Sequence, residues 1–400
     1  MAMKNKTIMF LGDGMADEPM EELGGRTPLM AANTPNMDWI AKMGRSGTML
    51  TLPDGFPTSS DVANMSVLGG DLATELCGRG PLEAASQGLE IGPDDVVFRV
   101  NLVTVSDEGI LLDFSGGHVG AAEQHSAIDI LNGVASEMKL AAGESLRFYP
   151  GVSYRNILVM HGKAFGAKDI VCDKPDDNHG NAVAEHLPRA KNDAGEYTAK
   201  VLCDIQAKAA EALKGRGANG IWCWSGGKPG AIHSVSERYS KRCAVISAVD
   251  VINGLGRTMG LDVIPVKGAT GFIDTNYEGK ADAAIKAIED GYDFVYVHVE
   301  AMDEVSHLRD LGLKLKAIED FDSRLIGRVR AAFGDGIAYC VLPDHPVPLA
   351  IGKHTRTPVP VAVYQPGERP DGVSHFDELS ALKGSLGAMR GSGLMDLVLG

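Results

Sequence analysis

Several short stretches of the chain are apolar almost without interruption, and each ends at a turn or at polar side chains. They are Thr7–Leu11, Asp293–Val299, Ile337–Leu342 and Val359–Tyr364. A run without polar alternation is typical of a strand covered on both faces, as in a parallel sheet. Helical patterns lie between them, for example at Ala281–Glu289 and Leu313–Ala332. This alternation predicts an α/β fold with a doubly wound, mostly parallel sheet.

The middle of the chain follows a different pattern. Strand-like segments at Val96–Val105 and Ile110–Phe114 are separated by a Ser-Asp-Glu-Gly turn, which predicts a hairpin, and Ala194–Leu213 is helical in pattern. A chain of 400 residues is also too long for one ordinary core. We therefore expect an inserted α+β domain in a discontinuous α/β domain. The predicted ranges are 76–245 for the insert, and 1–75 with 246–400 for the α/β domain.

Composition narrows the class of protein. The net charge is −15, with 44% hydrophobic and 23% charged residues, and no basic cluster of the kind that binds nucleic acid. The apolar run at Thr7–Leu11 is too short for a signal sequence or a membrane span. The six cysteines form no C-x-x-C pair, which is typical of reduced thiols. We expect a cytoplasmic protein without nucleic-acid or membrane partners, and no pattern indicates its oligomeric state.

Acidic and imidazole side chains gather at the predicted ends of strands. They are Asp13 after the first strand, Asp303 and His307 after the second, Asp344 and His345 after the third, and His354 before the fourth. Ligands bind beyond the carboxyl ends of strands in open α/β sheets. Carboxylate and imidazole ligands suit Mn²⁺ and Zn²⁺, and Mg²⁺ to a lesser degree. Three aspartates and three histidines are enough for two ions, which can clamp a phosphoryl group in transfer.

Each of these residues also has a structural interpretation. Asp13 could cap the following helix. Asp303 and His307, four residues apart, could form an ordinary pair on a helix surface. The joint placement of all six at strand ends favours a metal site.

A serine lies where a nucleophile for such a site is expected. Pro57–Ser60 has the composition of a loop, and Asp61–Leu68 that of a helix. Ser60 could act only as the N-cap of that helix, and Ser59 is a competing candidate. The N-terminus of a helix also receives anionic phosphate well, through its free N–H groups and its dipole.

An ordered series of motifs accompanies these residues. It comprises Phe10–Asp17, Ser60–Gly69, Phe98–Asn101, Gly151–Arg155, Gly268–Lys280, Asp303-x-x-x-His307, Asp344-His345 and His354–Pro360. Over nearly its whole length, the chain resembles the cofactor-independent phosphoglycerate mutases of the shorter, archaeal type. These enzymes belong to the alkaline phosphatase superfamily.

The resemblance implies an alkaline-phosphatase-like fold, roles for the site residues and two bound divalent ions. One ion would be held by Asp303, His307 and His354, and the other by Asp13, Ser60, Asp344 and His345. Ser60, rather than Ser59, would be phosphorylated as 3-phosphoglycerate and 2-phosphoglycerate are interconverted. The insert would bind the carboxylate and hydroxyl groups of the substrate. Lys280 and Arg155 are candidates for stabilising negative charge on the phosphate and carboxylate.

Two segments depart from the pattern of the family. Residues 173–179 replace a Pro-Pro-His-Asp type of loop, and Gly69-Gly70-Asp71 lacks an aromatic residue found in many relatives. These changes leave open a homoserine kinase or a phosphatase on the same scaffold, although no G-x-x-x-x-G-K-[ST] motif for ATP is present. A non-catalytic metal-binding regulator is a third alternative, but it would not need Ser60.

Overall fold

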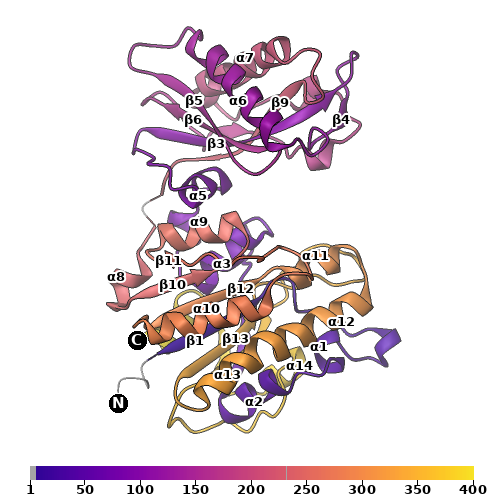
Figure 1. Cartoon of the computed structure of the whole chain (residues 1–400), viewed down its shortest axis with the longest axis vertical. Helices are drawn as coiled ribbons and strands as arrows, with labels where there is room; N and C mark the ends of the chain where they lie inside the picture. Colours follow the sequence, from indigo (N-terminus) through magenta and orange to yellow (C-terminus); the bar gives the residue numbers. More distant parts are fainter. Residues whose placement is uncertain (1–5, 231) are drawn as a thin grey trace. The chain divides into compact units, whose positions relative to one another are not determined.

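The computed structural model describes residues 6–230 and 232–400, and the chain divides into two compact units (Figure 1). Unit 1 comprises Met1–Leu76 and Ile232–Gly400, and unit 2 comprises Cys77–Ala231. The boundary expected at residues 245–246 is therefore wrong. It lies earlier because Cys243–Ile246 forms a strand, β10, that pairs in parallel with a central strand of unit 1.

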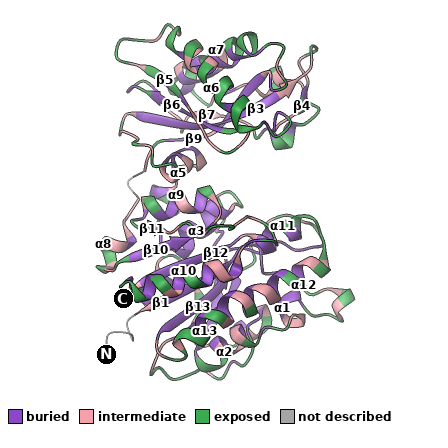
Figure 2. Cartoon of the chain, in the orientation of Figure 1, coloured by how far each residue is buried: buried purple, intermediate pink, exposed green. Residues whose placement is uncertain are grey.

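Unit 1 is built on an eight-stranded sheet in the order β11-β10-β12-β1-β13-β14-β2-β15. The strands are β1 Thr7–Gly12, β2 Arg45–Met49, β10 Cys243–Ile246, β11 Asp262–Val263, β12 Phe294–Val299, β13 Ala338–Pro343, β14 Val359–Tyr364 and β15 Gly387–Met389. Every residue of β1, β12 and β13 is buried, as the uninterrupted apolar runs predicted (Figure 2). The doubly wound, mostly parallel sheet is confirmed.

Strand β14 is the exception to the parallel arrangement. It pairs antiparallel with both β13 and β2, whereas β1 runs parallel to β12 and β13. Because β14 starts at the edge where β13 ends, the connection from Asp344 to His354 stays at the carboxyl edge of the central strands. The reversal of β14 thus keeps His354 beside the groups that follow β1 and β13.

Helices cover both faces of this sheet. They are α1 Pro28–Ala31, α2 Pro35–Met43, α3 Ser60–Val67, α4 Leu72–Glu75, α8 Val235–Tyr239, α9 Asp250–Thr258, α10 Tyr277–Glu289, α11 Ala301–His307, α12 Leu311–Asp320, α13 Gly327–Phe333, α14 Glu378–Ala381 and α15 Gly393–Leu399. The helix predicted at Leu313–Ala332 consists of α12 and α13 joined by a π-helical segment, Phe321–Ile326.

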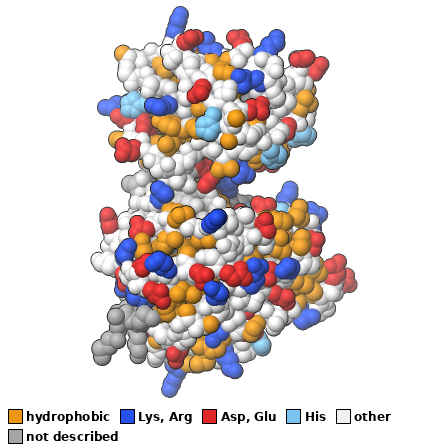
Figure 3. All heavy atoms as spheres, in the orientation of Figure 1, with side chains coloured by type: hydrophobic (Ala, Val, Ile, Leu, Met, Phe, Trp, Pro, Cys, Tyr) orange, Lys and Arg blue, Asp and Glu red, His pale blue; other side chains and the backbone are white. Residues whose placement is uncertain are grey.

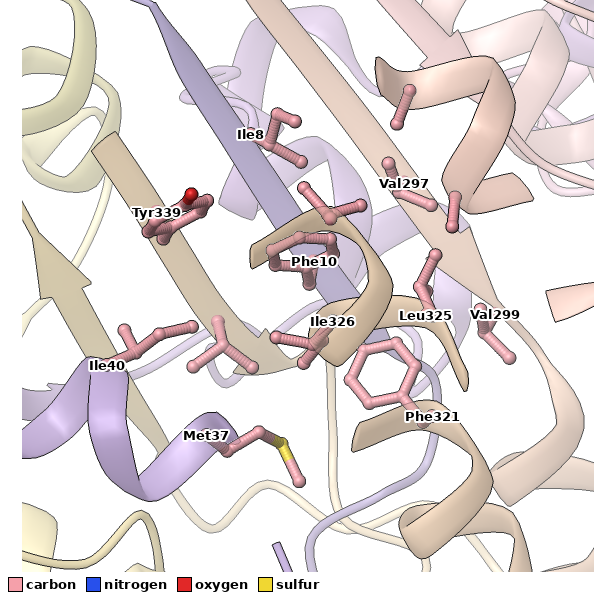
Figure 4. Packing of buried hydrophobic residues seen from close by; sticks show 14 of the residues in the cluster. Ile8, Phe10, Met37, Ile40, Val297, Val299, Phe321, Leu325, Ile326 and Tyr339 are labelled. Atoms are coloured by element: carbon pink, nitrogen blue, oxygen red, sulfur yellow. The ribbon is translucent and has the colours of Figure 1, made fainter. Parts of the chain in front are cut away.

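The core of unit 1 lies between the sheet and α2, α10, the π-helical segment and α13. Phe10 and Tyr339 from the strands pack with Met37 of α2 and Phe321 of the π-helical segment (Figure 4). Alternate residues of a strand point to opposite faces. Tyr296 of β12 therefore points away from this core, and its hydroxyl donates to Asn64 of α3 at 2.5 Å.

Unit 2 is an α+β body on an antiparallel five-stranded sheet. Its main strands are β3 Asp95–Val105, β4 Leu111–Asp113, β5 Ser145–Pro150, β6 Arg155–His161 and β9 Gly220–Gly227, with β7 Ile170–Val171 and β8 Arg189–Ala190 forming a separate pair. The predicted β3–β4 hairpin is confirmed. Helices α6 Ala121–Ser136 and α7 Glu196–Ala212 cover one face, and α5 Arg79–Ser86 covers the other.

Charged side chains of both signs alternate on the face of unit 1 that carries α10 and α13 (Figure 3). Arg324 pairs with Glu278 at 2.7 Å, and Arg328 pairs with Asp282 at 2.6 Å. Such exposed pairs add little stability, typically about 0–1 kcal/mol each. Among the described residues, no helix combines the length and the apolar character that crossing a membrane requires.

Candidate active site

Helix α11 and the β13–β14 connection bring three of the predicted residues together. Asp303 and His307 lie one helical turn apart, with His307 Nε2 at 3.2 Å from Asp303 Oδ2. His354 Nε2 lies 3.3 Å from Asp303 Oδ1 and 3.1 Å from His307 Nε2. The backbone carbonyl of Gly352 lies 2.9 Å from His307 Nδ1 and accepts its proton, which leaves Nε2 facing the other two groups.

A second group forms where β1 and β13 end and α3 begins. Asp13, Asp344 and His345 are fully buried, and His345 Nε2 lies 3.3 Å from Asp13 Oδ1 and 3.4 Å from Asp344 Oδ2. Ser60 Oγ is 3.3 Å from the same His345 nitrogen. The backbone N–H groups of Gly14 and His345 donate to Asp344 Oδ1 at 3.1 and 2.7 Å and fix that carboxylate.

Ser60 is the first residue of α3, and Ser59 occupies the N-cap position. The interpretation of Ser60 as the N-cap is therefore wrong. Neither serine forms a side-chain cap bond in the described structure. The Ser60 hydroxyl instead faces His345 at the end of a neighbouring strand.

The two groups adjoin each other. Ligand atoms of Asp13, Asp303 and His345 lie within 4.8 Å of one another, and the His345 and His354 rings stack with centroids 3.9 Å apart. All seven residues predicted as metal ligands thus lie at one edge of the unit 1 sheet. The spacing is compatible with two ions about 3.5–4 Å apart.

The buried carboxylates of this cluster carry negative charge that bound cations would stabilise. Burial raises the pKa of the Asp13 and Asp344 carboxyl groups well above their ordinary values. Asp13 Oδ1 and Asp303 Oδ1 are buried without a hydrogen-bond partner among the described residues, which is costly unless another ligand satisfies them. Burial also lowers the pKa of His345 to about 3, which keeps the ring neutral, as a metal ligand must be. The residues fit divalent ions.

The bond to Asp303 raises the pKa of His307 from 6.5 to about 9 in the metal-free protein. The bond between protonated His307 and Asp303 therefore contributes fully to folding stability below pH 6.5, and this contribution is lost as the pH rises through 9. An ion must displace this proton, so we expect metal affinity at this group to rise about tenfold per pH unit from about pH 7 and to level off above pH 9. Calorimetry in buffers of different ionisation enthalpy measures the released proton. Affinity that did not change over this range would contradict the prediction.

Comparison with known proteins identifies the family. A family model described as Metalloenzyme superfamily matches residues 5–400. A 2,3-bisphosphoglycerate-independent phosphoglycerate mutase of Methanosarcina acetivorans is 45% identical over 407 aligned residues, which cover 98% of this chain and 99% of that protein. The chain belongs to this phosphoglycerate mutase family. A probable member from Geobacter sulfurreducens is 44% identical, with 98% and 99% of the two chains covered.

Solved structures agree with this assignment to the phosphoglycerate mutases. A protein from Pyrococcus horikoshii matches with a TM-score of 0.80 at 28% identity, over 99% of this chain and 97% of that chain. A cofactor-independent phosphoglycerate mutase from Thermoplasma acidophilum matches with a TM-score of 0.68 at 28% identity, over 98% of both chains. The family resemblance stated from the motifs is confirmed.

Lys280 ends one of the motifs shared with the mutase family, and it was expected to stabilise negative charge on the phosphate. Its side chain is fully buried, and its amine donates to the backbone carbonyl of His298 at 2.9 Å. Burial lowers the pKa of Lys280 to about 8. The amine is bonded to the backbone and interacts with the charge of Glu300, so these contacts do not support the expectation that Lys280 contacts phosphate.

Arg155 lies in unit 2 at the start of β6, whereas the other candidates lie in unit 1. It is exposed, and its guanidinium lies 5.2 Å from the centroid of the Tyr154 ring. Its role in a phosphoglycerate mutase remains a prediction from the motif Gly151–Arg155.

Sequence reasoning missed several polar residues of this site. Asn64 donates to Asp344 Oδ2 at 2.9 Å and to the Ser60 carbonyl at 2.8 Å. His298 Nε2 lies 3.0 Å from Asp13 Oδ2 and 3.7 Å from Glu300 Oε2. The available signal was a lone histidine near the end of the apolar run at Asp293–Val299. Because ligands bind at this edge of open α/β sheets, a polar residue there is a candidate site residue.

Proposed function

We propose that the protein interconverts 3-phosphoglycerate and 2-phosphoglycerate through a phosphoserine at Ser60, with two divalent metal ions. The main support is the position of Ser60 Oγ, 3.3 Å from His345 Nε2 at the start of α3 and beside two buried aspartates. A serine placed there can act as a nucleophile, and the N-terminus of the helix favours binding of the phosphate dianion beside it.

In the first half-reaction, Ser60 Oγ loses its proton and forms a bond to phosphorus, while the bond between phosphorus and the substrate's 3-oxygen breaks and that oxygen takes up a proton to become a hydroxyl. In the second, the 2-hydroxyl of the retained glycerate loses its proton and forms a bond to phosphorus, while the bond between phosphorus and Ser60 Oγ breaks and Ser60 regains a proton. The bound ions would supply positive charge that favours the ionised serine and offsets the charge of the phosphoryl group. Water must be excluded between the two steps, since hydrolysis would release phosphate.

The proposed ions are held by two sets of side chains. Asp303, His307 and His354 form one set, and Asp13, Ser60, Asp344 and His345 form the other. Three histidines among the ligands favour Mn²⁺ or Zn²⁺ over Mg²⁺, which prefers oxygen ligands. We further propose that the protein acts in the cytoplasm on this small phosphate monoester.

Unit 2 is proposed to contribute groups that bind the substrate carboxylate, with Arg155 as the candidate. Arg155→Gln is expected to raise KM for phosphoglycerate about tenfold or more, because a charge-assisted hydrogen bond is worth about 1.5–3 kcal/mol. Arg147→Gln is a matched control, since Arg147 is also exposed in unit 2 and lies 5.2 Å from the Tyr149 ring centroid. Equal KM values for the two variants would remove Arg155 from the substrate site.

The activity is tested with purified protein, Mn²⁺ and 3-phosphoglycerate, in the absence of ATP and bisphosphoglycerate. Formation of 2-phosphoglycerate is expected, measured by coupling to enolase. Release of free phosphate without 2-phosphoglycerate would identify a phosphatase instead. The homoserine kinase alternative is not favoured, because the matching curated relatives carry the name of the mutase.

A further inference from the structure

Strand β12 carries a buried histidine, His298, in contact with Asp13 of the candidate site, and the proposed reaction does not use it. His298 is fully buried, and both of its ring nitrogens have partners. Nε2 lies 3.0 Å from Asp13 Oδ2, and Nδ1 lies 3.1 Å from Ser247 Oγ. Buried polar groups are normally hydrogen-bonded, so the identity of the two partners decides what this histidine can do.

The partners define the direction of each hydrogen bond. Asp13 must be ionised to hold an ion, and an ionised carboxylate only accepts, so the proton of a neutral imidazole then lies on Nε2 and is donated to Asp13. Nδ1 then accepts the proton of the Ser247 hydroxyl. The Ser247 oxygen in turn accepts the backbone N–H of Val249 at 3.0 Å. This chain of bonds starts at the backbone and ends at Asp13, so it fixes the orientation of the imidazole.

We propose that His298 is a positioning residue that orients the Asp13 carboxylate for the ion beside Ser60. The bond to His298 engages Oδ2, and Oδ1 is left facing His345 Nε2 at 3.3 Å without a hydrogen-bond partner among the described residues. Oδ2 is thus held by His298, and Oδ1 is left to bind the ion. Partners of this kind typically change metal affinity about 10–100-fold when they are removed. The inference rests on the proposed role of Asp13 as a metal ligand, and it is independent of the substrate.

An alternative to the hydrogen bond between His298 and Asp13 is a third metal ion bound by these residues. Ligand atoms of Asp13, His298 and Glu300 lie within 4.8 Å of one another. The Lys280 amine, however, is already bonded to the His298 carbonyl at 2.9 Å, and it interacts with the charge of Glu300. A cation from the chain itself therefore lies at this group, which favours a hydrogen bond between His298 and Asp13 over a third metal.

The test compares metal binding by the full-length wild type, His298→Ala, His298→Gln and Ser247→Ala, using Mn²⁺ calorimetry and metal analysis. His298→Ala is expected to weaken one of two ions about 10–100-fold and to leave the other within about threefold. His298→Gln keeps an N–H donor and should recover most of the affinity. Ser247→Ala should weaken the same ion by a smaller factor, about threefold to tenfold. Saturating Mn²⁺ should restore the turnover of His298→Ala, which a purely structural defect would not allow.

Two results would overturn the inference. One is that the wild type binds three ions and His298→Ala binds two, since His298 would then be a metal ligand. The other is unchanged affinity for both ions in His298→Ala. If that variant does not fold, as judged by its melting transition, unchanged affinity in Ser247→Ala overturns the inference instead. Metal binding is measured without substrate, so a lack of mutase activity would count against the proposed function alone.

Discussion

Replacing Ser60 with alanine is expected to reduce mutase activity by at least about 10³-fold, because no other group can take up the phosphoryl group in the same place. The protein should remain folded, since Ser60 is not the N-cap of α3 and, among the described residues, its hydroxyl has one hydrogen-bond contact, with His345 Nε2 at 3.3 Å. A loss of about 1 kcal/mol or less in unfolding free energy is expected from that contact. Coupled assays, mass measurement of the phosphorylated protein and thermal unfolding test the three statements.

Ser59→Ala is the matched control for this variant. Ser59 precedes Ser60, lies half-buried at the N-cap and makes no cap bond in the described structure. It should keep near wild-type activity and the phosphoserine signal. Activity that survived in Ser60→Ala and vanished in Ser59→Ala would assign the nucleophile to Ser59.

Replacing His307 with alanine is expected to remove one of the two ions and to lower turnover at least about 100-fold. His307 Nε2 converges with His354 Nε2 and Asp303 Oδ2 at 3.1 and 3.2 Å, so the remaining pair would offer one ligand too few. The ion beside Ser60 uses other side chains and should stay bound. Metal analysis of dialysed protein should give about one ion per chain, compared with about two in the wild type.

His375→Ala controls for the loss of a histidine from unit 1. His375 pairs with Asp38 at 3.1 Å on the surface, away from the proposed ligands in sequence. It should keep both ions and full turnover. Two ions and normal activity in His307→Ala would return Asp303 and His307 to the surface-pair interpretation.

The order of the elements and most of the site followed from residue pattern. Asp13 and Asp344 were placed correctly because a polar residue directly after a buried strand has few positions available at the edge of a sheet. The direction of β14 was not predictable, since a strand buried on both faces has the same composition whether it runs parallel or antiparallel. Strand β10 was missed because four residues are too short to give a periodic signal.

Side-chain direction was the other part that pattern did not provide. The motif around Lys280 indicated a cation near the site, but its side chain on α10 is buried and its amine donates to the backbone carbonyl of His298 in β12. His298 was treated only as part of the apolar run at Asp293–Val299, which predicted a strand. Only its distances to Asp13 and Ser247 show what it contacts.

The discontinuity of unit 1 has a consequence for the order in which the protein folds during synthesis. Asp13 and His298, which are in direct contact, are separated by 285 residues. At about 5–20 residues per second, the ribosome needs on the order of 15–60 s between them. Strand β1 must therefore wait unpaired until β12 and β13 emerge, whereas unit 2 is contiguous and is complete much earlier. The metal site can form only after nearly all of the chain has been made, so metal retention reports on completed folding.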